Sequence, residues 1–260
     1  MPTLPTVTAL NDLLAHATAV RRCRATACFA ALAAHFGTNS PVVLEARVDR
    51  RRAYVTGNGD RSWSGVYRRW LRDGTLPRDK TIDHVLERSA GAVDLRRWRD
   101  LMLWGLLTPA PQLLNPPEVR AAQFSQQIRR IVFENFENHL RGKFRSLQIP
   151  PKRILSLRNL RSLEAFHALV YLARESELIG DSSQDLLPAI CAFEILPTVL
   201  QRHRPLRFHY EGFFSCFERV MCRRLLYSES SYSILEDASA AVRTSLTANF
   251  SSDIRGCDGQ

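Results

Sequence analysis

Apolar residues in this 260-residue chain recur at spacings of three and four, and this periodicity constrains the fold more than any other feature. Two stretches carry it most clearly, residues 118–147 and 207–228. The buried stripes that it predicts are Phe124, Ile128, Ile131, Val132, Phe136, Leu140 and Phe144, and Phe213, Phe214, Phe217, Val220, Met221 and Leu225. Strand-like alternation is rare. We therefore predict an all-α fold, with a basic helical N-terminal region followed by a helical bundle.

A proline-rich stretch, residues 108–117 (TPAPQLLNPP), divides the chain. Four prolines in ten residues cannot continue a helix, so we predict a linker there. The basic helical region then covers residues 1–110, the bundle 118–250 and a tail 251–260. Up to the end of the linker the chain has 17 basic and 10 acidic residues, against 19 and 16 in the remainder. The basicity is therefore concentrated in the N-terminal region.

The formal charge of +10 comes from 33 Arg and only 3 Lys. G+C-rich coding produces such an excess without any functional demand, whereas a site for phosphate or carboxylate selects Arg for its planar, bidentate guanidinium. The sequence leaves both explanations open. No apolar stretch reaches the ~20 residues that cross a bilayer, and the six cysteines form neither a C-x-x-C pair nor a disulfide framework. We therefore expect a cytoplasmic protein with reduced thiols and no membrane partner.

The strongest local constellation lies in residues 61–87, RSWSGVYRRWLRDGTLPRDKTIDHVLE. Its pattern predicts a helix from about Ser62 to Arg72, ended by Gly74, and a second helix that begins after Pro77. On the first helix one side gathers Trp63, Val66, Tyr67, Trp70 and Leu71, and the other gathers Arg61, Gly65, Arg68 and Arg72. We expect the first side to pack and the cationic side to face a partner. A merely solvated Arg face is the alternative interpretation.

Within that segment Arg69-Trp70, Gly74, Pro77, Thr81-Ile82 and Val85 together resemble the end of the recognition helix, and the following turn and helix, of Cro/C1-type (XRE-like) helix-turn-helix proteins. In that family an aromatic residue closes the recognition helix, a glycine turns the chain and a proline begins the next helix. The resemblance implies that Trp70 packs and that Arg61, Ser62, Ser64, Arg68 and Arg69 face DNA. With Arg72 of the cationic side, these five are the predicted nucleic-acid-binding residues.

The resemblance covers about a tenth of the chain. The family places another helix immediately before the recognition helix. Its nearest match here, Leu32-Ala33 to Gly37, is separated from Ser62 by 24 residues. An expanded loop would therefore replace the family's tight turn.

A second basic zone lies between Glu137 and Glu164, where no acidic residue occurs. Its members are Arg141, Lys143, Arg145, Lys152, Arg153, Arg158 and Arg161. The helix dipole favours cations at a helix C-terminus but not at an N-terminus, where Lys152 and Arg153 are expected. These two residues indicate either an anionic partner or acidic side chains from elsewhere in the same domain.

Motifs for catalysis and metal binding are missing from the sequence. There is no phosphate loop and no nucleophile elbow. Glu164 and His167 form a single E-x-x-H pair, whereas di-metal bundles need two. We therefore expect no enzyme activity, no metal and no cofactor.

The leading hypothesis is a bacterial cytoplasmic DNA-binding or regulatory protein that contacts duplex DNA, or another polyanion, through its Arg-rich helix. In this hypothesis the bundle serves for homodimerisation or for binding a partner. The alternative is a helical adaptor that binds an acidic protein partner, such as a phage-defence or secretion component. Co-purified nucleic acid would favour the first, and a co-purified polypeptide the second.

Overall fold

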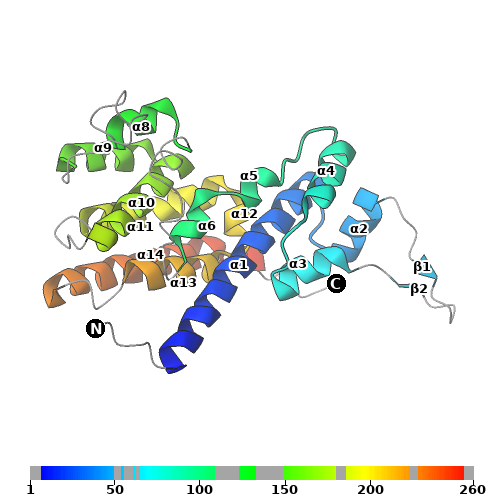
Figure 1. Cartoon of the computed structure of the whole chain (residues 1–260), viewed down its shortest axis with the longest axis horizontal. Coiled ribbons are helices and arrows are strands. Elements are labelled where there is room, and N and C mark those ends of the chain that lie inside the picture. The colour runs from blue at the N-terminus through cyan, green and yellow to red at the C-terminus, as the bar shows by residue number, and fades with distance from the viewer. Residues whose placement is uncertain are drawn as a thin grey trace. The chain divides into compact units, whose positions relative to one another are not determined.

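The computed structural model of the protein describes residues 7–49, 54–55, 61–62, 65–108, 123–132, 149–179, 186–222 and 228–254. Over these residues the predicted all-α fold is confirmed, with one two-residue antiparallel strand pair (Figure 1). The elements are α1 Val7–Phe36, α2 Pro41–Asp49, β1 Tyr54–Val55, β2 Arg61–Ser62, α3 Val66–Asp73, α4 Asp79–Arg88, α5 Arg96–Arg99, α6 Met102–Leu106, α8 Gln126–Val132, α9 Pro151–Leu160, α10 Leu163–Ile179, α11 Leu186–Arg202, α12 Arg204–Arg207, α13 Tyr210–Met221 and α14 Glu229–Ile254.

The chain folds as two compact units, which we call unit 1 and unit 2. Unit 1 comprises Met1–Trp104 and His203–Cys216. Its central element is the long helix α1, against which α2, α3, α5 and α12 pack (Figure 1). The inward face of α1 carries small or flat apolar residues, which let these neighbours approach closely: Ala25, Ala27, Cys28, Phe29, Leu32 and Ala33 are all buried. Helix α3, which carries Arg68, Arg69 and Arg72 of the predicted site, therefore packs on this helix.

Helix ends in unit 1 follow the local sequence. Gly37 ends α1 in the left-handed region, at φ 62°. Ser40 precedes α2 and its Oγ accepts the Val43 N–H at 3.5 Å, while Pro41 occupies the first helical position. The helix that we expect after Pro77 is α4, which begins at Asp79.

Unit 2 comprises Gly105–Arg202 and Phe217–Gln260. Helices α10 and α11 form its centre, α9 and α14 pack against α11, and α8 packs against α9 and α10. The Phe217 ring lies against the rings of Phe166 and Phe193, at centroid distances of 5.4 and 4.8 Å. Of the predicted stripes, the members buried in the described residues are Phe124, Ile128 and Val132, and Phe213, Phe214, Phe217, Val220 and Met221. The other members lie outside the described residues, apart from Ile131, which is half-buried.

Each unit is built from two separate stretches of the chain, and the domain bounds that the proline-rich stretch predicts stay a prediction. His203–Cys216 joins unit 1, because α12 packs on α1 and the Phe208 ring lies 5.8 Å from that of Phe29. Of the predicted linker only Thr108 is described, at the end of the α6 segment. The predicted tail begins as helix, since α14 continues to Ile254, and residues 255–260 lie outside the described part.

Candidate nucleic-acid interface

Helix α3 keeps the division into two faces that its sequence predicts. Tyr67 and Trp70 are each 1% exposed, and their rings meet edge to face at 5.0 Å. Arg68, Arg69 and Arg72 are exposed, and we call these three residues the α3 basic face. One face of this eight-residue helix is therefore fixed in the core while the other presents three guanidinium groups to solvent.

Two glycines in the left-handed conformation set the length of α3. Gly65 lies before its first residue at φ 65°, and Gly74 follows its last residue at φ 63°. The Cβ of other L-residues clashes in this conformation, whereas glycine has no Cβ. Each glycine can therefore bound the helix at little cost in free energy. The predicted end at Gly74 is confirmed. The predicted start at Ser62 is wrong, because the helix begins at Val66.

Arg61 and Ser62 lie in β2, where Ser62 pairs with Tyr54 and Arg61 with Val55. The expected helical register of Arg61 with Arg68 and Arg72 is therefore wrong. The physical reason is local: the strand-favouring Tyr54-Val55 precedes a Gly- and Asn-containing connection that suits a hairpin. Ser64, like the connection itself at residues 56–60, lies outside the described residues.

Contacts with α1 and α2 hold α3 in place. At its N-terminal end the Gly65 N–H donates to Oε2 of Glu45, 3.2 Å away, and Glu45 is 4% exposed. At its C-terminal end Gly74 lies so close to α1 that an added Cβ would sit 3.1 Å from the Cα of Arg22. The Arg22 guanidinium also donates from Nη2 to the Arg72 carbonyl, at 2.5 Å. Both ends of α3 are thus anchored to other helices.

Arg22 is an exposed residue of α1 that our sequence analysis did not assign to the site. Its contact with the Arg72 carbonyl places it beside the α3 basic face. Asp73 is the carboxylate in this group, and Arg72 binds it through Nε at 2.6 Å and Nη2 at 3.1 Å. The hydrogen bond from Arg72, together with the charges of Arg72, Arg69 and Arg22, holds the pKa of Asp73 below its ordinary value.

Several other arginines of unit 1 are engaged inside the fold. Arg99 pairs with Asp79 at 2.7 Å and with Asp100 at 2.8 Å, and Arg24 reaches Asp100 at 3.3 Å. Arg96 pairs with Asp83 at 2.5 Å. These arginines join α1, α4 and α5 and are absent from our list of site residues. Arg68 and Arg69 differ from them, because neither forms a salt bridge to another described residue within 4.0 Å.

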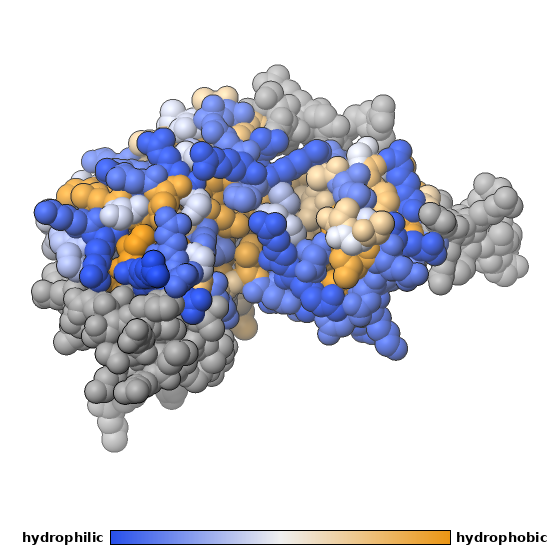
Figure 2. Space-filling view, turned by 90° about the horizontal axis from the view of Figure 1, so that it is seen from above, coloured by the Kyte–Doolittle hydropathy of each residue, from blue (hydrophilic) through white to orange (hydrophobic). Residues whose placement is uncertain are grey.

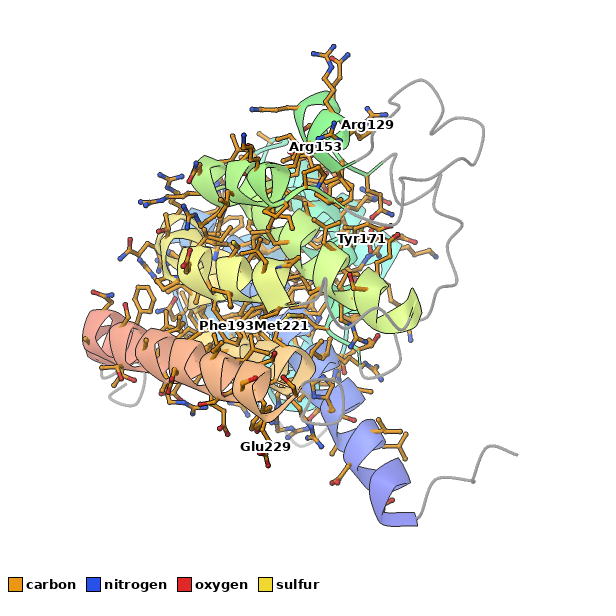
Figure 3. All side chains as sticks on the ribbon, turned by 90° about the vertical axis from the view of Figure 1, so that its left-hand side faces the viewer. Arg129, Arg153, Tyr171, Phe193, Met221 and Glu229 are labelled. Carbon is orange, nitrogen blue, oxygen red and sulfur yellow. The ribbon has the colours of Figure 1, made fainter. Side chains whose placement is uncertain are left out.

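The second basic zone is divided between described and undescribed residues. Arg141, Lys143 and Arg145 lie outside the described residues. Lys152 is exposed at the start of α9, and Arg153 follows it and is half-buried. Helix α9 packs against α8, which carries Arg129 (both arginines are labelled in Figure 3).

The two remaining members of that zone serve the packing of unit 2. Arg158 pairs with Glu194 of α11 at 3.4 Å. Arg161, at φ 46°, ends α9, and its carbonyl accepts a hydrogen bond from Arg202 at 3.0 Å. Of these two residues, Arg158 therefore has an acidic partner within unit 2.

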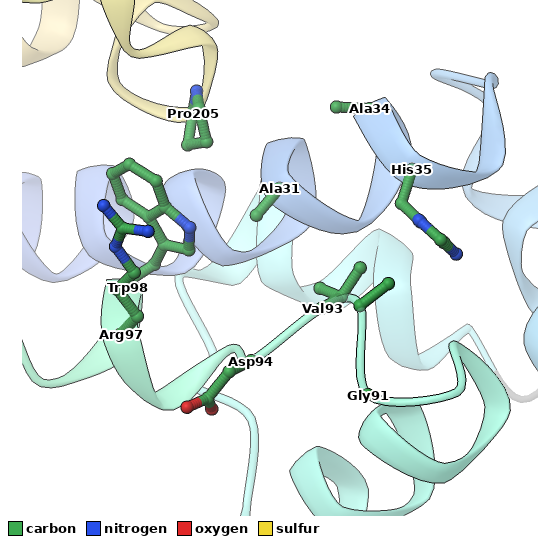
Figure 4. A pocket seen from close by; sticks show the side chains of 10 residues that line it. Ala31, Ala34, His35, Gly91, Val93, Asp94, Arg97, Trp98 and Pro205 are labelled. Carbon is green, nitrogen blue, oxygen red and sulfur yellow. The ribbon is translucent and has the colours of Figure 1, made fainter.

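A shallow cavity of about 300 Å³ opens in unit 1 (Figure 4). Its lining consists of Ala31, Ala34, His35, Gly91, Ala92, Val93, Asp94, Arg97, Trp98 and Pro205. The Arg97 guanidinium lies 5.6 Å from the centre of the Trp98 ring, and Asp94 accepts the Arg96 N–H at 2.9 Å. Two polar side chains of the wall, Arg97 and Asp94, are thus engaged with neighbouring groups of the fold.

The cysteines of the described residues are thiols, with none in a disulfide. Burial raises the pKa of Cys28 to about 12 and that of Cys191 to about 11. A hydrogen bond with Cys216, together with burial, raises the pKa of Cys23. Among the described residues, no three His, Cys, Asp or Glu side chains gather as metal ligands would.

Comparison of the chain with protein-family models, with curated proteins and with solved structures gives no match in any of the three. Within the described part of the chain no single helix has the length and apolar character of a membrane span. Residues Asn11–Phe36 and Pro41–Asp49 satisfy that criterion only as a pair, across a bend of 66°. The face shown in Figure 2 is mostly hydrophilic, with hydrophobic side chains in patches between the polar ones.

Proposed function

We propose that this protein binds the phosphate backbone of duplex DNA through α3, as a regulatory protein with a helix-turn-helix-like segment. The observation that carries the proposal is the exposure of Arg68, Arg69 and Arg72 on a helix whose opposite face is buried through Tyr67 and Trp70. A guanidinium fork matches two phosphate oxygens, and a rigidly held helix presents such forks at fixed spacing.

The composition of the exposed face indicates which part of DNA it contacts. The side chains of α3 include no amide and no hydroxyl other than that of Tyr67, which is buried. Phosphate contacts position a protein on the duplex, whereas specificity comes from groups that reach base edges. An Arg fork can also pair with a guanine edge, but without amides or hydroxyls beside them we expect the three arginines to contact chiefly phosphate.

The expected salt dependence follows from the number of cations. Three phosphate contacts give a slope of about −2.7 for log K against log[salt], which is a loss of about fortyfold in affinity between 50 and 200 mM salt. This value is what an anisotropy titration with a fluorescent duplex should return if α3 provides the main contacts.

The decisive experiment compares two triple variants of equal charge change. In the first, Arg68, Arg69 and Arg72 become Gln. In the second, the three exposed cations of the α4 segment become Gln: Arg78, Lys80 and Arg88. We expect the α3 variant to lose most of the affinity and most of the salt slope, and the α4 variant to keep both.

Equal losses in the two variants, or affinity for duplex that is insensitive to salt, would overturn the proposal. Circular dichroism of each variant checks that the helices are retained. Purified wild-type protein that carries a bound polypeptide and no nucleic acid would favour the acidic-partner adaptor instead.

A further inference from the structure

Three arginines from two helices lie near one carboxylate at the C-terminal end of α3. Arg72 donates hydrogen bonds to both carboxylate oxygens of Asp73, from Nε at 2.6 Å and from Nη2 at 3.1 Å. Arg69 lies one helical turn before Asp73 and therefore on the same side of the helix. Arg22 comes from α1 and reaches the Arg72 carbonyl, so it stands beside the pair. We call Arg22, Arg69 and Arg72 the junction arginines.

The cluster has a surplus of positive charge. Three guanidinium groups face one carboxylate, and the helix dipole adds only about half a negative charge at this end. Two carbonyls near this end of α3 are occupied, because Arg69 O accepts from the N–H groups of Gly74 and Thr75, and Arg72 O accepts from Arg22. Arg22, Arg69 and Arg72 are exposed, so an anion from solvent can reach their guanidinium groups.

The Asp73 carboxylate occupies the position on the Arg72 guanidinium that a phosphate group would take. A carboxylate and a phosphodiester both present two oxygens in the plane of a guanidinium fork, and Arg72 already binds Asp73 in this two-point manner. Arg72 and Asp73 have 70% and 37% of their side-chain surfaces exposed. A backbone phosphate can therefore reach the fork directly, and it must compete with Asp73 when it does.

We infer that the junction arginines form one binding site for a DNA backbone phosphate, and that Asp73 is an internal competitor that lowers the affinity of this site. The inference rests on the proposed function and adds two things to it. It brings α1 into the interface through Arg22, and it gives the protein a built-in limit on how tightly it holds DNA.

The test of the competitor compares Asp73→Asn with Asp83→Asn, using a fluorescent duplex. Both aspartates are exposed, lie in unit 1 and pair with an arginine, so Asp83 is a matched control. Each variant removes one negative charge, so the net charge changes equally. We expect Asp73→Asn to bind at least about threefold more tightly than Asp83→Asn and to steepen the salt slope by about 0.9, the value for one added phosphate contact.

The test of Arg22 uses Arg22→Gln, which keeps the aliphatic stem that packs against Gly74, with Arg88→Gln as the matched control. We expect Arg22→Gln to weaken binding, to reduce the slope by about 0.9, and to cancel most of the gain of Asp73→Asn when the two are combined. Arg88→Gln should leave the affinity, the salt slope and the gain from Asp73→Asn nearly unchanged.

The outcomes distinguish a failure of the junction site from a failure of DNA binding. If the wild type binds duplex through α3 but Asp73→Asn and Asp83→Asn behave alike, the competitor is refuted and the proposed function stands. If Arg22→Gln behaves as Arg88→Gln does, the junction site is refuted. Wild-type protein that does not bind duplex overturns both the inference and the proposed function.

Discussion

Replacing Gly74 with Ala tests how α3 is seated on α1. The backbone at Gly74 has φ 63°, and a Cβ there would lie 3.1 Å from the Cα and 3.2 Å from the backbone nitrogen of Arg22. Those neighbours are main-chain atoms of a long helix, so they cannot rotate away as a flexible side chain would. The substitution must therefore either strain the turn or move α3 outward.

Gly65 provides the matched control. It has nearly the same conformation, at φ 65°, but among the described residues beyond its chain neighbours no atom lies within 4 Å of an added Cβ. Its replacement by Ala incurs the left-handed strain of about 1–2 kcal/mol, partly offset by about 0.4–1 kcal/mol from the restricted unfolded chain. Gly74→Ala incurs the same net cost and an overpacking cost of about 1–3 kcal/mol as well. We expect about 1 kcal/mol for Gly65→Ala and about 2–4 kcal/mol for Gly74→Ala.

Urea unfolding followed by tryptophan fluorescence measures both values. All four tryptophans fall within Met1–Trp104, so their emission reports on unit 1. With a typical urea m-value of about 2 kcal/mol/M, Gly74→Ala should lower the midpoint by about 1–2 M and Gly65→Ala by about 0.5 M. Midpoints that agree within about 0.2 M would refute the close approach of α3 to α1.

Three further predictions concern other contacts. Glu45→Ala leaves the Gly65 N–H without its carboxylate, so it should destabilise unit 1 by about 1–3 kcal/mol in the same urea assay, with Glu45→Gln costing less. Arg99 and Arg24 hold the pKa of Asp100 below its ordinary value of 3.8. The stability from Asp100 should therefore be complete above about pH 4 and be lost as the pH falls through the lowered pKa, and Asp100→Asn should flatten the dependence of melting temperature on pH in that window. Burial raises the pKa of the thiols of Cys23, Cys28 and Cys191. In the native protein these thiols should therefore react with a thiol-specific disulfide reagent at pH 8 far more slowly than they do in urea. Rapid native labelling of these three, located by mass spectrometry, would contradict their placement in the core.

The local sequence of α3 was enough to predict its two most buried side chains and its end. Tyr67 and Trp70 were expected on the packed side of a helix, and both are buried. The end of that helix at Gly74 was also readable in advance. These properties are local, because helical periodicity and glycine conformation depend on residues within a turn or two of one another.

Which charges meet depends on how the helices pack against one another. Nothing near Arg22 in the sequence indicates that its guanidinium reaches the end of α3, 50 residues away. Arg99 and Arg69 look alike in the sequence, yet Arg99 is engaged by Asp79 and Asp100 while Arg69 faces solvent. Ion pairs form between whatever side chains the packing of helices brings within about 4 Å. A basic surface of this chain is therefore a property of its packing, although the residues that supply it can be counted in the sequence.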